Sequence, residues 1–136
     1  MNWLGILLAS LMVFVIGGPW YGKLFRNAWG KAAGYTPEAM EAARKDESKR
    51  KHPAKVFGGS FVLGVLAAAT LAWILGPNPS IVPAMMTGLY LGAGIGATSL
   101  GINYLFAGRT VALLLIDGGY TAVLFAAMGL VLGIAG

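Results

Sequence analysis

Hydrophobic residues gather in four long stretches along this chain, at about residues 3–20, 56–75, 81–106 and 111–134. A helix rises about 1.5 Å per residue, so each stretch reaches, or nearly reaches, across the roughly 30 Å hydrocarbon core of a bilayer. Helices satisfy all their backbone hydrogen bonds internally, as the bilayer requires. We therefore expect an all-α integral membrane protein, a four-helix bundle that forms a single membrane domain over residues 1–136.

The segment between the first two stretches, residues 21–55, is polar and predicts two further helices. From residue 21 to residue 32 apolar side chains recur every three or four positions and basic side chains occupy the other side. That pattern is typical of an amphipathic helix at the membrane interface. Thr36 and Pro37 then supply a hydroxyl cap and a proline at the first helical position. We expect a solvated helix from there to about Lys51.

Aromatic residues mark the ends of the first stretch and continue into the amphipathic segment. Tryptophan and tyrosine are enriched where a protein meets the membrane–water interface. The first stretch lacks both the basic region and the small-x-small cleavage site of a signal peptide, so we interpret it as a retained helix. The residues expected at the membrane interface are Trp3, Trp20, Tyr21 and Trp29.

The charged residues predict how the chain is oriented in the membrane. Only 11% of the residues are charged, against about a quarter in soluble proteins. Nine of the ten lysines and arginines lie between residues 21 and 55, and the tenth is Arg109. The positive-inside rule places both regions in the cytoplasm and both termini on the outer side. The net charge of +5 then indicates membrane lipids as partners, rather than nucleic acid.

Few side chains are available for catalysis or metal binding. The chain has no cysteine, His52 is its one histidine, and Asp117 is the one carboxylate outside the long loop. These residues assemble neither a cluster of transition-metal ligands nor a nucleophile with its base. We therefore expect no metal, no cofactor and no catalytic residue, and we do not expect an enzyme.

Small residues recur four positions apart in the apolar stretches. Such faces allow helix backbones to approach closely within a membrane, because no large side chain separates them. The clearest example is the series Gly88, Gly92 and Gly96 in the third stretch. The full set expected at helix contacts is Gly64 and Ala68 in the second stretch, Gly88, Gly92 and Gly96 in the third, and Gly129 and Gly133 in the fourth.

Asp117 lies inside the fourth stretch, where an ionisable side chain costs at least ~2.5 kcal/mol. Tyr120 follows one turn later, Asn103 and Tyr104 lie at similar depth on the preceding helix, and Ser99 shares the Asn103 face. These five residues are predicted to form a candidate ion or proton site. The alternative is structural: Asp117 makes a hydrogen bond or ion pair at the helix end, and Asn103 fixes the register of two helices.

Three short motifs resemble those of a known family. They are Trp20-Tyr21 followed by Leu24-Phe25 and Trp29; Ala-Thr-Ser-Leu-Gly-Ile-Asn-Tyr-Leu-Phe at residues 97–106; and Leu-Ile-Asp-Gly-Gly-Tyr at residues 115–120. Over essentially its whole length the chain resembles domain-of-unknown-function family seventeen sixty-one. The resemblance implies a four-span protein of a bacterial cytoplasmic (inner) membrane with no established activity. Members often carry a histidine directly after the Gly-Tyr pair, where this chain has Thr121.

Two functions of different classes fit these patterns. The first is a small homo-oligomeric transporter or channel-like protein, with Asp117 as its cation or proton site and the glycine faces joining subunits as well as helices. The alternative is a non-catalytic accessory or structural subunit of a larger membrane complex, which docks a soluble partner on residues 36–51. A lipid-modifying enzyme using Asp117 has the least support, because a lone carboxylate lacks a partner base or nucleophile.

Overall fold

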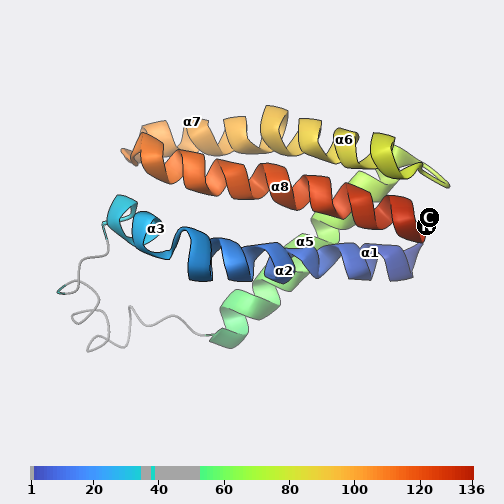
Figure 1. The fold of residues 1–136 in the computed structure, drawn as a ribbon, viewed down its shortest axis with the longest axis horizontal. Coiled ribbons are helices and arrows are strands. Elements are labelled where there is room, and N and C mark those ends of the chain that lie inside the picture. Colours follow the sequence, from blue (N-terminus) through green and yellow to red (C-terminus); the bar gives the residue numbers. More distant parts are fainter. Residues whose placement is uncertain (1, 35–37, 39–52) are drawn as a thin grey trace.

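The computed structural model describes residues 2–34, 38 and 53–136, and every regular element in these ranges is a helix (Figure 1). The predicted solvated helix, residues 36–51, lies outside the described residues apart from Glu38. The described elements are α1 (Trp3–Ser10), α2 (Met12–Pro19), the π-helix η1 (Trp20–Leu24), α3 (Arg26–Ala32), α5 (Pro53–Leu75), α6 (Ile81–Leu91), the π-helix η3 (Gly92–Ala97), α7 (Thr98–Ala107) and α8 (Val111–Ala135).

Among the described residues, four helical runs are long and apolar enough to cross a membrane. They are Trp3–Leu24, Ala54–Leu75, Ile81–Ala107 and Val111–Ala135, with 22 to 27 residues each. The prediction of an all-α, multi-pass membrane protein is therefore confirmed, with spans slightly longer than those expected from hydropathy alone. About half of their large hydrophobic side chains are exposed, as is expected of surfaces that face lipid.

Helix α8 lies at the centre of the bundle (Figure 1). The run α6–η3–α7 packs along one side of it, the run α1–α2 lies along the other, and α5 crosses behind them obliquely. The Asn2 side-chain amide donates to the carbonyl oxygen of Ala135 at 2.8 Å, so the two ends of the chain meet at one end of the bundle. The completely buried side chains of Ile6 and Met128 pack there in an apolar core.

The contact between α6 and α8 depends on glycine. A Cβ atom added at Gly88 would lie 2.1 Å from the carbonyl oxygen of Phe125, and one added at Gly129 would lie 2.2 Å from that of Ala84. The two helices thus approach backbone to backbone. The other predicted packing residues also face neighbours in this chain: Gly64 faces Val13, Gly92 faces Phe125, Gly96 faces Thr121, Gly133 faces Ile81, and Ala68 is buried.

The predicted helix from residue 21 to residue 32 is not continuous. Pro19 has no backbone N–H to donate, and just after it the chain winds as the π-helix η1, closed by a bond of 2.9 Å from the Phe25 N–H to the Trp20 carbonyl. Phe25 then leaves helical geometry, with φ near −122°, and α3 begins only at Arg26. The third span also contains a π-helical segment, η3, that the pattern did not predict.

Candidate functional site

The carboxylate of Asp117 joins three elements to α8. Its Oδ1 atom accepts hydrogen bonds from the Tyr21 hydroxyl at 2.6 Å and from the Trp29 indole N–H at 3.1 Å. Its Oδ2 atom accepts from the Tyr104 hydroxyl. Two of the donors belong to η1 and α3, near the start of the chain, and the third belongs to α7, the element that precedes α8. We call Asp117 and these three aromatic residues the Asp117 cluster.

The π-helix η1 explains how the first span reaches this cluster. Two consecutive residues of η1 bond two consecutive residues of α8: the Trp20 indole donates to the carbonyl of Ile116 at 3.0 Å, and Tyr21 donates to Asp117. A Cβ atom on Gly119 would come within 3.1 Å of the Trp20 ring, so this glycine makes room for the indole. The π-helical winding of η1 and the missing side chain at Gly119 therefore together allow the first span to reach the cluster.

Further aromatic contacts support the hydrogen bonds. The Tyr21 ring lies edge-on to Trp29, with centroids 6.0 Å apart, and edge-on to Tyr120 at 5.2 Å. Edge-to-face pairs of this kind contribute about 0.5–1.5 kcal/mol beyond their burial. The Tyr120 hydroxyl itself donates to the carbonyl of Val13 at 2.8 Å, not to Asp117. Tyr120 thus ties α2 to α8 and braces the cluster from beside it.

The carboxylate is held by neutral donors. Asp117 is half-buried, and in the described part of the chain no basic side chain forms an ion pair with it. An ionised carboxylate has about four acceptor positions, of which the three aromatic donors use three. Among the described residues there is also no group of three or more acidic, histidine or cysteine side chains that could hold a metal ion. The chemistry available at this site is that of one carboxylate surrounded by hydroxyl and indole donors.

The family to which the chain belongs follows from a sequence comparison. The family model described as a protein of unknown function, DUF1761, matches residues 4–133, which include all of the Asp117 cluster. The chain belongs to the DUF1761 family. No curated protein and no solved structure matches it. The predicted resemblance is therefore confirmed, and the function of this DUF1761 protein has to be argued from its own geometry.

The structure brings together some of the predicted site residues in this DUF1761 chain and separates others. Tyr104 bonds Asp117 as expected, whereas Asn103 and Ser99 are exposed and make no described hydrogen bond to it. The reason is helical geometry: consecutive residues point about 100° apart, so α7 cannot present Asn103 and Tyr104 to α8 together. Ser99 lies one turn before Asn103, on its exposed side.

Two cluster residues, Tyr21 and Trp29, were predicted as membrane-interface anchors and not as partners of Asp117. Tyr21 lies near one end of the first span and Trp29 lies just beyond it, and the polar atoms of both turn inward to the carboxylate. The sequence did contain a signal for this contact. A carboxylate in a span needs hydrogen-bond donors. Tyrosine and tryptophan at an interface each carry a polar atom that usually finds a partner. What the pattern could not give was the fold of η1 and α3 back onto α8.

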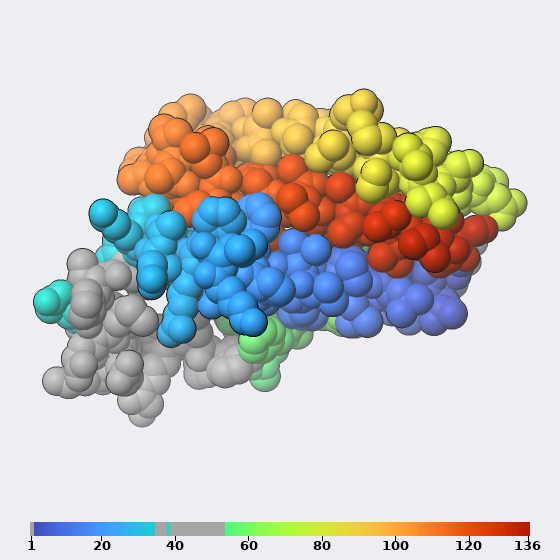
Figure 2. Space-filling view, viewed as in Figure 1, coloured from blue at the N-terminus to red at the C-terminus, as the bar shows by residue number. Residues whose placement is uncertain are grey.

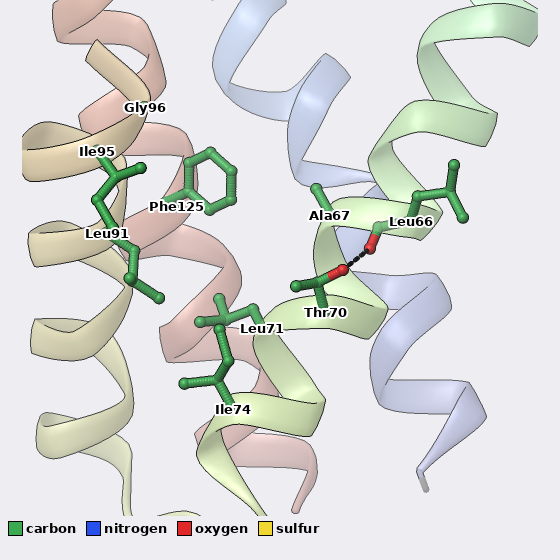
Figure 3. Close-up of a pocket in the computed structure, with 9 residues that line it drawn as sticks. All are labelled: Leu66, Ala67, Thr70, Leu71, Ile74, Leu91, Ile95, Gly96 and Phe125. Carbon is green, nitrogen blue, oxygen red and sulfur yellow. Dashed lines mark hydrogen bonds between the residues drawn. The ribbon is translucent and has the colours of Figure 1, made fainter. Parts of the chain in front are cut away.

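A second feature of this DUF1761 protein is an apolar pocket between α5 and the run α6–η3, with α8 behind it (Figure 3). Its volume is about 420 Å³. The hydroxyl of Thr70 faces this region but donates to the Leu66 carbonyl of its own helix at 2.8 Å. The pocket therefore suits hydrocarbon rather than a polar ligand. Its lining residues are Leu66, Ala67, Thr70, Leu71, Ile74, Leu91, Ile95, Gly96 and Phe125.

Proposed function

We propose that this DUF1761 protein is a small membrane carrier that exchanges a proton or a monovalent cation at Asp117. The observation that carries this proposal is that Asp117 places a half-buried carboxylate within a span. The described hydrogen-bond partners of that carboxylate are all neutral. A purely structural contact among these helices could be made by an uncharged side chain, without the ~2.5–3.5 kcal/mol or more that a charge costs in a span. Because the chain retains this costly charge, we infer that the charge has a functional role.

The surroundings of Asp117 favour a carrier over an open channel. Toward the end of the bundle where the termini meet, the core between α1, α5 and α8 is apolar and almost completely buried, and it includes Ile6, Leu71 and Met128. The one buried hydroxyl described nearby, that of Ser10, donates to the Leu7 carbonyl of its own helix. A cation bound at Asp117 would meet this apolar core before it could leave at that end. Alternating access, in which helices move to open the second side, fits such a barrier.

The proposal includes an orientation and an assembly state. The exposed residues Lys23, Arg26 and Lys31 belong to η1 and α3, which bond Asp117, and Arg109 lies just before α8. Under the positive-inside rule this end faces the cytoplasm of a bacterial inner membrane, with both termini outside. We propose a homo-oligomer whose contacts use the outer face of α5, because the glycines of α6 and α8 already pack against each other. We further propose that the protein is not an enzyme, since a lone carboxylate lacks a nucleophile or second acid.

The test replaces Asp117 with asparagine, which keeps the size of the side chain and an oxygen acceptor but removes the charge. We expect proton or cation flux into vesicles containing the purified protein to fall to the level of empty vesicles. The matched control is Asn103→Ala, since Asn103 is a polar residue at similar depth on the exposed side of α7; its flux should stay within about twofold of the parent. Equal flux in the Asp117→Asn variant, or none in the parent, would overturn the proposal.

A second candidate function is the accessory role, and the pocket beside α5 favours it. Its open, apolar lining could receive a hydrophobic element of a larger membrane complex. Purification in a mild detergent separates the two candidates. A homogeneous homo-oligomer supports the carrier, whereas stoichiometric co-purification with an unrelated membrane complex supports the accessory role.

A further inference from the structure

Positive charge collects where α3 meets the start of α8. Figures 1 and 2 show α3 beside the first turns of α8 at one end of the molecule. Lys23 on η1, Arg26 and Lys31 on α3, and Arg109 just before α8 are all exposed. Lys55 is exposed too, but it begins α5, whose first turns lie apart from this place in Figure 1. The other four exposed cations belong to η1, α3 and the residue pair before α8, not to α5.

A hydrogen bond joins the two segments that carry Lys31 and Arg109. The Thr110 hydroxyl, which also caps the start of α8, donates to the carbonyl of Ala32 at 3.4 Å. Lys31 and Arg109 are the residues immediately before these two partners in the sequence. We call the four residues Lys31, Ala32, Arg109 and Thr110 the α3–α8 junction. A lysine and an arginine from distant parts of the chain, both exposed, thus each lie next to one partner of this hydrogen bond.

No described carboxylate neutralises this surface. The described acids are Glu38 and Asp117, and the oxygens of Asp117 accept from the three aromatic donors. In the ranges that the structure covers, Lys31 and Arg109 form no ion pair. Among the described residues, no acidic side chain therefore competes with an external anion for these two charges.

The junction also lies at the ends of spans, where lipid headgroups are expected. Three of the four spans end or begin close to it, at Leu24, Ala107 and Val111. Leu24 is 68% exposed and follows Lys23 directly, so apolar and basic side chains alternate at this level. A headgroup phosphate at this height would have its acyl chains beside exposed apolar residues of the spans. The site thus matches an anion that carries hydrocarbon better than it matches a free anion.

We propose that the α3–α8 junction binds the headgroup of an anionic phospholipid in the adjacent leaflet. The guanidinium of Arg109 offers a planar set of donors that suits a phosphate, and Lys31 adds a second positive charge. The Asp117 cluster contributes indirectly, because Tyr21 and Trp29 hold η1 and α3 on α8 and so fix the height at which the cations are presented. This inference does not depend on transport by Asp117.

The experiment measures lipid selectivity at the protein surface. The full chain is reconstituted in phosphatidylcholine vesicles containing traces of spin-labelled phosphatidylglycerol or spin-labelled phosphatidylcholine, and the protein-associated fraction of each label is compared. We expect the parent to favour phosphatidylglycerol. The double variant Lys31→Gln with Arg109→Gln should lower that preference at least about fivefold, the effect of one basic residue near an anionic membrane surface. Because these charges are exposed, 1 M salt should also weaken the preference.

The controls separate this site from positive charge in general. Lys55→Gln removes an exposed charge from α5 and should change the preference less than about twofold, and Lys31→Arg should retain it. Three results would overturn the inference: no preference in the parent, an equal loss in the Lys55→Gln variant, or displacement of the labelled lipid by millimolar inorganic phosphate. The last result would assign the junction to free phosphate.

Discussion

Replacing Gly88 with alanine is expected to destabilise the protein by about 3 kcal/mol or more, the upper range for overpacking a close contact. The added methyl would lie 2.1 Å from the carbonyl oxygen of Phe125 and 2.8 Å from its carbonyl carbon. Both are backbone atoms, so no side-chain rotation can relieve the clash, and α6 must move away from α8. The measurement is unfolding of the purified protein in detergent, followed by circular dichroism.

The same span supplies a matched control in Gly94. A Cβ atom there meets nothing within 4 Å, and the residue is exposed. Gly94→Ala makes the same chemical change and gives the helix the same gain in intrinsic propensity, so it should be neutral or stabilising by up to about 1 kcal/mol. The difference between the two variants isolates the close approach of the helices. Similar stabilities for the two would contradict the packing of α6 on α8.

Replacing Asp117 with alanine is expected to cost about 2–4 kcal/mol and to release α3 from α8. The hydroxyls of Tyr21 and Tyr104 and the indole N–H of Trp29 would lose their shared acceptor, and a buried donor without a partner costs about 1–3 kcal/mol. The cluster is only half-buried, so water recovers part of that cost. Asp117→Asn should cost less than about 1 kcal/mol, because its oxygen can still accept and its amide can donate to a tyrosine oxygen.

The release of α3 can be measured directly. The chain has no cysteine, so spin labels can be attached to cysteines placed at the exposed positions Ala28 on α3 and Val111 on α8. We expect a narrow distance distribution in the parent and in the Asp117→Asn variant, and a broad one in the Asp117→Ala variant. A narrow distribution in all three would mean that contacts other than the Asp117 cluster hold α3.

The spans could be predicted from the sequence because their signal is local. Each is a run of apolar residues longer than the bilayer core, and no tertiary contact is needed to recognise it. The packing role of Gly88 and Gly129 could be expected from spacing alone, but the partner of each could not. The structure pairs them across one interface, each against the backbone of the other helix. Glycines used in this way within the chain are not available for contacts between subunits.

The candidate site was only partly predictable because it depends on non-local geometry. Asp117 and Tyr104 could be found together, since a short connection joins their two helices and fixes their relative depth. Tyr21 and Trp29 come from the other end of the chain, and they reach Asp117 only because the chain after Pro19 winds as a π-helix and then bends at Phe25. No periodic pattern in the sequence encodes that change of winding.

The central claim is that the carboxylate of Asp117 itself exchanges its cation or proton, and isotope-edited infrared difference spectroscopy tests it most directly. The carboxyl carbons of aspartate are labelled, and spectra of the protein in vesicles are recorded before and after a change of pH or addition of a candidate cation. Asp117 is the only aspartate in the spans, and Asp46 in the long loop is replaced by asparagine to leave one labelled side chain. We predict a shift of the carboxylate band in the parent that is absent from the Asp117→Asn variant. A carboxylate band that stays unchanged under every condition that drives flux would contradict the account and leave Asp117 with a structural role.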